Sequence, residues 1–187
     1  MKSPAVEDQF REIMSRFVTG VTIVTSCHSN EVHGLTCNAF CSISLHPPTI
    51  LVSISTNTRS DRLMRQSKVL AVNVLSDSQT ELSNRFAGRH KHKEADRFEG
   101  FQWRKGVTGA PIFEGTQAYL DCKVVNAFES GDHTLFVAEV LDSGVQETLS
   151  PLIFYRSEYM TLNGLKGAKA CQNPSDRNQD RSPSCPA

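Results

Sequence analysis

The sequence predicts a mainly β fold with flanking helices, in which short antiparallel strands form a closed or nearly closed barrel. Most apolar stretches are short and alternate apolar with polar residues, as at 117–124, which is typical of strands with one buried face. Turn-forming residues separate these stretches. No Gly-x-Gly-x-x-Gly motif follows any of them, which disfavours a doubly wound sheet that binds a dinucleotide.

The expected strands begin with a hairpin and end with two short pieces. A tight turn at Gly131 and Asp132 joins the two longest strands, and the nearly continuous apolar run of the second predicts burial on both of its faces. The strands are expected at residues 21–27, 32–36, 49–55, 69–75, 117–124, 134–141, 152–155 and 159–162.

The first expected helix is amphipathic. Its apolar residues recur at i, i+3, i+4 and i+7 between Phe10 and Phe17, within residues 7–17. Gly20 is expected to end it.

Two further helices are expected at capping patterns. Thr58-x-x-Asp61 opens one of them, because a hydroxyl followed three residues later by an acid satisfies the first N–H groups of a helix. Ser78-x-x-Glu81 repeats the pattern and opens the other, which Gly88 is expected to close. The polar stretch at residues 89–97 is expected to be an exposed loop or a short helix.

Composition divides the chain into one domain at residues 1–164 and a tail at residues 165–187. Residues 166–187 contain no aromatic, β-branched or Leu residue, so they cannot bury enough apolar surface to fold, and we expect the tail to be disordered. The whole chain has 187 residues, of which 39% are hydrophobic and 21% charged, which suits one globular domain with its own core.

Charge and hydropathy exclude several classes of partner. The 20 Lys and Arg balance the 20 Asp and Glu, so we expect no nucleic acid partner, since binding one requires a basic surface. No apolar run reaches the roughly 18 residues that span a membrane. The first residues turn acidic where a signal peptide would turn apolar, so a cytoplasmic protein without membrane contact is expected.

The six cysteines do not suggest a metal site or a disulfide framework. None forms a Cys-x-x-Cys pair, and no His pair lies at zinc-binding spacing. Cys27, Cys41 and Cys122 fall in strand-like stretches and are expected as small buried side chains.

Residues 33–62 have the features of a site for an anion beside a flat ring. Thr58, Arg59 and Ser60 lie at an expected helix N-terminus, where free N–H groups and the helix dipole favour phosphate. Small side chains at 34–39 would let a ring approach the backbone closely. An ordinary capping box and an ordinary hairpin edge explain the same patterns, and spacing alone leaves that alternative open.

Catalytic constellations are sparse. No serine lies in a Gly-x-Ser-x-Gly motif, and no cysteine lies in a context that would activate it. His133 is the strongest candidate, because it follows the Gly131-Asp132 turn at a strand start, where a side chain can reach over a cleft. His33 leads into the small-residue stretch and could contact a ligand, but it is expected to be a solvent-facing strand residue. A single turn histidine such as His133 is also often structural.

Six segments together resemble the short-chain flavin reductase family, the small component of two-component flavin-dependent monooxygenases. They follow one another in the order and spacing of that family, over about residues 7–163. The segments are FVTGVTIVT at 17–25, GLTCNAFCSIS at 34–44 followed by Pro47-Pro48, residues 51–60, AVNVL at 71–75, RFAG at 85–88 and GDHTLF at 131–136. The resemblance implies an antiparallel split β-barrel of the FMN-binding type, usually assembled as a homodimer.

The resemblance also implies which residues bind the cofactors. His133 matches a histidine associated with the nicotinamide nucleotide, and would be the catalytic residue. The flavin would be held at its ring, its ribityl chain and its phosphate by three groups: Thr36, Cys37, Asn38 and Ala39; Ser53, Ile54 and Ser55; and Arg59, Ser60 and Arg89.

The implied function is a flavin reductase that transfers hydride from NADH or NADPH to FMN, or to FAD, and supplies reduced flavin to a partner monooxygenase. The cofactors carry this chemistry, so the lack of a catalytic triad does not argue against an enzyme. Two alternatives remain: a non-catalytic flavin-binding module on the same barrel, and an interaction domain without a cofactor.

Overall fold

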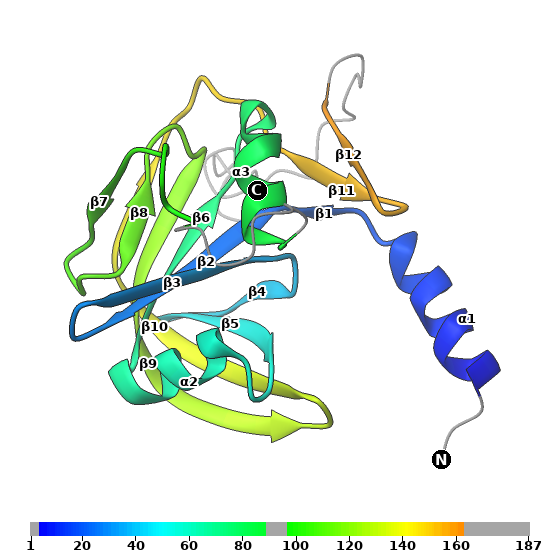
Figure 1. Ribbon diagram of the computed structural model, residues 1–187, viewed down its shortest axis with the longest axis horizontal. Coiled ribbons are helices and arrows are strands. Elements are labelled where there is room, and N and C mark those ends of the chain that lie inside the picture. Colours follow the sequence, from blue (N-terminus) through cyan, green and yellow to red (C-terminus); the bar gives the residue numbers. More distant parts are fainter. Residues whose placement is uncertain (1–3, 89–96, 163–187) are drawn as a thin grey trace, which may run out of the picture.

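The computed structural model describes residues 4–88 and 97–162, and a seven-stranded antiparallel sheet forms its centre (Figure 1). The strand order is β3-β2-β6-β9-β10-β5-β4, with two smaller sheets, β1-β11-β12 and β7-β8, beside it. The helices are α1 (Pro4–Ser15), α2 (Arg59–Ser67) and α3 (Thr80–Phe86), with the 3-10 turn η1 (Asp77–Gln79) before α3. The strands are β1 (Thr19–Gly20), β2 (Thr22–His28), β3 (Glu31–Cys37), β4 (Phe40–Leu45), β5 (Pro48–Ser55), β6 (Val69–Val74), β7 (Trp103–Lys105), β8 (Pro111–Phe113), β9 (Ala118–Ser130), β10 (His133–Val145), β11 (Ile153–Tyr155) and β12 (Glu158–Met160).

This architecture confirms the expected mainly β, antiparallel fold with flanking helices. The β2–β3 hairpin and the Gly131-Asp132 turn between β9 and β10 form as the sequence predicts. Strands β1, β7 and β8 were not predicted, because each has only two or three residues and carries no readable periodicity. Strand β4 was expected only as a strand-like stretch around Cys41, without bounds. No helix in the described part of the chain is long and apolar enough to cross a membrane.

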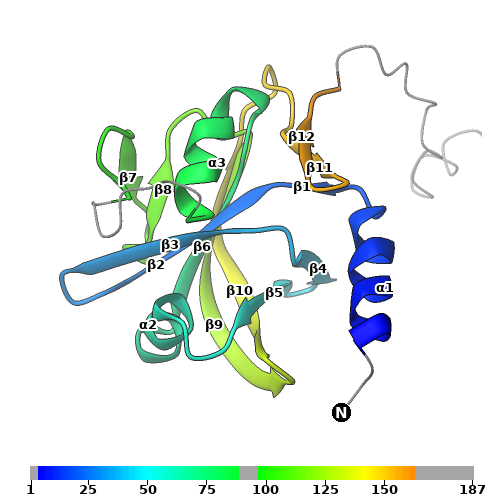
Figure 2. The ribbon, with the colours of Figure 1, turned by 45° about the vertical axis from the view of Figure 1, so that its right-hand side comes forward.

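Two helices lie on opposite sides of β3 (Figure 2). Helix α2 contacts β2 and β3 near one edge of the large sheet and β5 near the other. A first core cluster lies under α2 and includes Met64, Val52 and Phe136. A second cluster surrounds α3 and is rich in aromatic residues, among them Phe86.

Gly34 makes room for Phe86. A β-carbon at residue 34 would lie 2.9 Å from Phe86 Cε1 and 3.1 Å from Thr25 Cγ2. The Phe86 ring is fully buried and meets the rings of Phe98 and Phe113 edge-on, with centroids 5.1 and 5.2 Å away, so it cannot withdraw. The missing side chain of Gly34 therefore makes room for the Phe86 ring of the core, and not for the ring of a ligand.

Several element boundaries differ from the predictions. The first helix ends at Ser15, and Gly20, which was expected to stop it, lies in β1 opposite Ile153. The second capping box begins at Ser76 and not at Ser78: the Ser76 N–H donates to Gln79 Oε1 at 3.1 Å. Ser76 is favoured because it is fully buried and its hydroxyl can also donate to a backbone carbonyl, at 2.9 Å.

The predicted burial of β10 and of two cysteines was wrong. Only one face of β10 is buried, at alternate residues, and Leu141 at the end of the apolar run is exposed. Cys122 is buried as expected, but Cys27 is half-buried and Cys41 is exposed. Strands β2, β9 and β10 lie close to where they were predicted, but the sequence of a strand does not show how many layers of the protein cover it. The expectations for residues 89–96 and for the tail at 165–187 lie outside the described residues.

Replacing Gly34 by alanine is expected to lower the free energy of unfolding by about 1–3 kcal/mol, because the added methyl group overpacks the contact with Phe86. Chemical denaturation measures the change. Gly20→Ala is the matched control, since no atom lies within 4 Å of a β-carbon at residue 20, and a change within about 0.5 kcal/mol is expected there. Equal stability of the two variants would contradict this role of Gly34.

Candidate functional site

The first turn of α2 is built by a reciprocal cap. Thr58 is the N-cap residue, and its Oγ1 accepts the N–H of Asp61 at 3.2 Å, as the sequence predicts. The buried Asp61 carboxylate accepts the N–H of Asn57, also at 3.2 Å. The N–H groups of Arg59 and Ser60 belong to the first turn, where the helix itself offers no acceptor. Together with the helix dipole, these donors favour an anion at this end of α2.

Two residues of β3 hold this turn. Glu31 Oε1 accepts a hydrogen bond from Arg59 Nε at 2.6 Å, and His33 Nδ1 lies 2.8 Å from Ser60 Oγ. Residues 31 and 33 share one face of the strand, because side chains alternate along it. Ser60 is 2% exposed, so His33 reaches it within the protein. The expectation that His33 faces solvent was wrong, since α2 covers this face of β3.

Burial and three guanidinium groups keep His33 neutral. Desolvation, followed by the charges of Arg59, Arg97 and Arg62, lowers the pKa of His33 to about 4, and the Glu31 carboxylate only partly opposes this. At neutral pH the ring can therefore donate to or accept from the Ser60 hydroxyl, depending on its tautomer. These three positive charges outnumber the Glu31 carboxylate that also acts on His33, and such an excess of positive charge favours an anion.

The segment between β3 and β4 offers fewer side chains than the sequence suggested. The Thr36 hydroxyl donates to the Ser83 carbonyl of α3 at 2.6 Å. Cys37 points into the core, where burial raises the pKa of its thiol to about 11, so it is uncharged at neutral pH. Asn38 and Ala39 are exposed, and they are the residues of this segment that a ligand can reach with least rearrangement.

Strands β5 and β10 bring hydroxyl groups and His133 to one exposed face. Ser55 is paired with His133 in the register, and its Oγ lies 3.3 Å from His133 Nε2. The Nδ1 atom of the same ring lies 2.7 Å from Asp132 Oδ1, and this hydrogen bond holds the pKa of Asp132 below its usual range. Ser53 shares the face with Ser55, whereas Ile54 between them is 1% exposed and leaves only its backbone accessible.

A hollow of about 760 Å³ joins the α2 cap to the turn that precedes His133. Thr58 and Gly131 line it from the two sides, together with Arg62 and Arg65 of α2. Arg65 is bound by three groups: the Asp61 carboxylate at 2.9 Å, Glu129 at 2.8 Å and Thr134 Oγ1 at 2.8 Å. These contacts tie α2 to the β9–β10 hairpin, so the two predicted parts of the site are fixed relative to one another.

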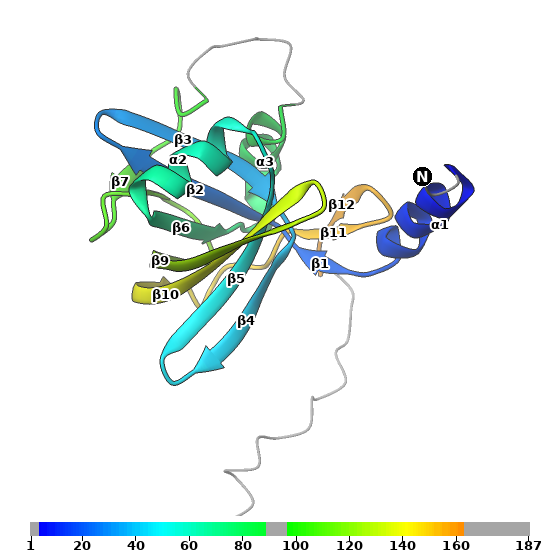
Figure 3. The same ribbon diagram turned by 90° about the horizontal axis from the view of Figure 1, so that it is seen from below.

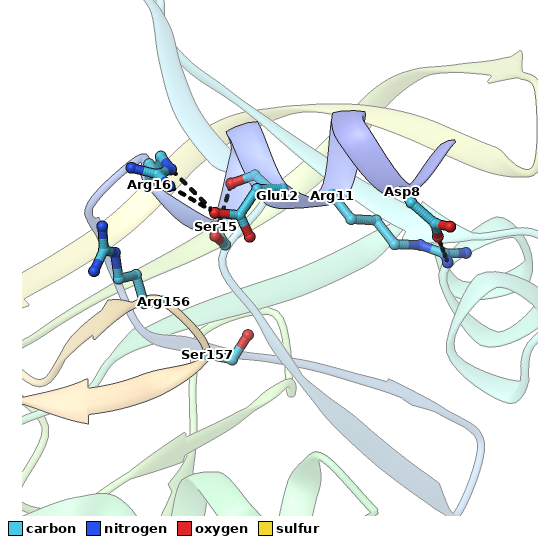
Figure 4. A pocket seen from close by; sticks show the side chains of 7 residues that line it. All are labelled: Asp8, Arg11, Glu12, Ser15, Arg16, Arg156 and Ser157. Carbon is cyan, nitrogen blue, oxygen red and sulfur yellow. Dashed lines mark hydrogen bonds and ion pairs between the residues drawn. The ribbon is translucent and has the colours of Figure 1, made fainter. Parts of the chain in front are cut away.

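A second pocket, of about 430 Å³, lies between α1 and the β11–β12 turn (Figure 4). Two of its arginines are already paired within the helix, Arg11 with Asp8 at 3.6 Å and Arg16 with Glu12 at 2.8 Å. None of the residues predicted for the flavin site lines this pocket or the hollow at the α2 cap. The α2 region is the better candidate because Arg59 and Ser60 directly follow Thr58, and His133 closely follows Gly131, on the two sides of that hollow.

The structure thus brings together most of the predicted site residues along β5, α2 and the start of β10. Arg89 lies outside the described residues. Sequence reasoning missed Glu31, and it missed the contact of His33 with Ser60. The only available signal was a pair of polar residues at i and i+2 in a strand just before the small-residue segment, and it does not reveal which helix they meet.

Comparison with known proteins identifies the family. Residues 14–163 match the model of the flavin reductase like domain. The chain belongs to this family. The resemblance inferred from six loose segments is therefore confirmed.

Similar proteins cover most of this chain. An NADH-dependent flavin reductase of Rhodococcus sp is 40% identical over 81% of this chain and 84% of its own length. The reductase subunit HsaB of a flavin-dependent monooxygenase of Mycobacterium tuberculosis is 36% identical over 86% of this chain and 85% of its own. The solved Streptomyces globisporus NADH:FAD oxidoreductase SgcE6, in complex with NAD and FAD fragments, has a TM-score of 0.77 and 30% identity over 86% of this chain and 94% of that one. The predicted fold is shared with solved flavin reductases.

His33 should make the stability of the protein fall between neutral and mildly acidic pH. Its pKa in the folded state, about 4, lies below its ordinary value of 6.5, so the unfolded chain binds more protons between these values and stability is lost as the pH falls through them. His33→Gln should show a smaller loss of unfolding free energy between pH values of about 7 and about 5. Denaturant titration measures it, with exposed His46→Gln as the control that keeps the wild-type loss. An unchanged pH dependence in His33→Gln would contradict the burial of a neutral imidazole.

Proposed function

We propose that this chain is an NADH-dependent flavin reductase that reduces FMN, or FAD, and supplies reduced flavin to a partner monooxygenase. The observation that carries the proposal is the first turn of α2, where unpaired first-turn N–H groups and the Ser60 hydroxyl lie beside His33, whose pKa is lowered by the charges of three arginines. The names of the similar proteins support three parts of the proposal: the flavin as acceptor, NADH as donor and the role as a monooxygenase component. A cytoplasmic location is part of the proposal.

The donors present fit a flavin nucleotide. The α2 turn with Ser60 and Arg59 would hold the phosphate, and Ser53 and Ser55 would hydrogen-bond the ribityl hydroxyls. The exposed backbone from residue 38 to residue 39 would meet the polar edge of the ring. Thr36, Cys37 and Ile54 would contribute through their backbone groups, because their side chains are engaged or buried.

The protein's part in the reaction is to bind and to orient. When bound, the flavin accepts the hydride of the nicotinamide nucleotide, which is chemistry that the two cofactors supply. Holding two reactants in the right geometry can contribute about 7–11 kcal/mol to the lowering of the barrier. His133 stands at the rim of the β5–β10 face, held between Ser55 and Asp132, and would orient the nicotinamide nucleotide.

The assay follows NADH consumption with purified protein and added FMN, FAD or riboflavin, with NADPH in parallel. Consumption of NADH that depends on flavin and exceeds the rate without protein is expected. Flavin that is bound and retained without turnover would indicate the alternative, a flavin-binding module. The absence of any rate above background with either nucleotide would exclude the reductase.

His133→Ala should separate hydride transfer from flavin binding. We expect kcat/KM for NADH to fall by about tenfold or more, because a misplaced reactant loses that much or more of the rate, while the Kd for FMN stays within about twofold. Steady-state kinetics and fluorescence titration measure the two quantities. The exposed His46, in the turn between β4 and β5, provides the control variant His46→Ala. Loss of FMN affinity in His133→Ala would contradict its assigned role.

We also propose that the protein is a homodimer and that α1 forms part of the interface. The helix stands away from the body of the chain (Figures 1 and 3). Its apolar face lies in solvent: Phe10 and Ile13 are each more than half exposed, and so is Phe17, just after the end of the helix. Such a face commonly marks a protein interface, and a second copy of this chain is the partner that the family resemblance implies.

Phe10→Asp should weaken the dimer, because it places a charge in an apolar contact. Analytical ultracentrifugation at several protein concentrations should give a dimer for the wild type and a shift toward the monomer for the variant. Arg11→Gln, on the same helix but in an exposed ion pair, is expected to remain dimeric. A wild-type protein that sediments as a monomer throughout would contradict the proposal.

A further inference from the structure

Arg59, which would hold the flavin phosphate, already has a carboxylate partner. Its Nε donates to Glu31 Oε1 at 2.6 Å across the gap between β3 and α2. The hydrogen bond to Arg59 is the largest cause that lowers the pKa of Glu31, so the carboxylate is ionised at neutral pH. The positive charge at the α2 turn is therefore partly cancelled from within the chain.

The two contacts from β3 to this turn differ in kind. His33 is uncharged at neutral pH, and its ring can adapt to either direction of the bond with Ser60 when a ligand arrives. Glu31 is negatively charged and accepts from the Nε of Arg59, which is one of the donors that a phosphate oxygen would otherwise use on this guanidinium. A phosphate with two negative charges must either displace this carboxylate or bind beside a like charge.

The exposure of the pair makes displacement feasible. The side chains of Arg59 and Glu31 are 54% and 40% exposed, so both groups remain solvated when they separate. The other carboxylate at this turn, Asp61, is buried, caps the helix and is paired with Arg65. Asp61 is thus part of the framework, whereas Glu31 can move without loss of the cap.

We propose that Glu31 competes with the ligand phosphate for Arg59 and so keeps the affinity for phosphorylated flavins low. This inference rests on the proposed function, since it concerns the same site. For a protein that hands reduced flavin to a partner, a built-in competitor speeds release, because affinity differences of this kind lie mostly in the dissociation rate. Glu31 is accordingly a residue that determines specificity and release, and it takes no part in the chemistry.

The test measures the Kd of FMN and of riboflavin, which lacks the phosphate, by fluorescence titration of the full chain without NADH. Glu31→Gln should bind FMN about two- to fivefold more tightly than the wild type, the range of an exposed ion pair, and should bind riboflavin equally. Glu12→Gln is the matched control, because Glu12 also pairs with an arginine at 2.8 Å but lies on α1. It should leave both affinities unchanged.

A double-mutant cycle tests whether the effect passes through Arg59. Arg59→Gln should weaken FMN binding, and adding Glu31→Gln in that background should have no further effect. An Arg59→Gln variant with wild-type FMN affinity would overturn the inference. So would an equal gain from Glu31→Gln with and without Arg59, which would mean that the carboxylate acts by its charge alone.

Three further outcomes of the FMN and riboflavin titrations would also refute the inference. Weaker FMN binding by Glu31→Gln would mean that Glu31 orients Arg59 for the phosphate and does not compete with it. An equal change for FMN and riboflavin would mean that the phosphate is not involved. If the wild type binds neither flavin, the proposed function itself fails; if it binds FMN and Glu31→Gln is unchanged, only this inference fails.

Discussion

The site depends on how the first turn of α2 is fixed in place. Thr58 and Asp61 cap it from within, and Asp61 also holds Arg65, which reaches the β9–β10 hairpin. Glu31 and His33 hold it from β3. Because β3 lies at one edge of the large sheet and β5 next to the other, these contacts bridge the two ends of the sheet. The end of β5 and the α2 turn proposed to bind the phosphate are thereby held in a fixed position relative to one another.

The two faces of β3 contact different helices, so most side chains of this strand are engaged within the protein. The face with Gly34 and Thr36 serves α3: the glycine admits the Phe86 ring, and the threonine hydroxyl binds the Ser83 carbonyl. The opposite face contacts α2 through Glu31 and His33, and it contributes Cys37 to the core. What is left for a ligand is the exposed stretch that follows the strand, at Asn38 and Ala39. A single strand therefore positions both helices and leads into the segment that is proposed to meet the flavin ring.

The sequence predicted the features that depend on local patterns. The hairpins, the Thr58-x-x-Asp61 cap and most strand positions follow from alternation and from turn residues, and each was found within a few positions. The features it did not predict depend on contacts between distant segments. The partial burial of His33 against Ser60 and the pairing of Glu31 with Arg59 are set by which face of β3 is covered by α2. Periodicity within β3 or β5 shows that two faces exist but does not say what covers them.

The central claim is that the α2 turn binds the flavin phosphate beside the β5 hydroxyls. A crystal structure of the complex with FMN tests it most directly. The account predicts phosphate oxygens within about 3.2 Å of Ser60 Oγ or of the first-turn N–H groups, and the ring along residues 38 and 39. A phosphate bound elsewhere, with Arg59 still bonded to Glu31 and Ser60 still bonded to His33, would contradict it.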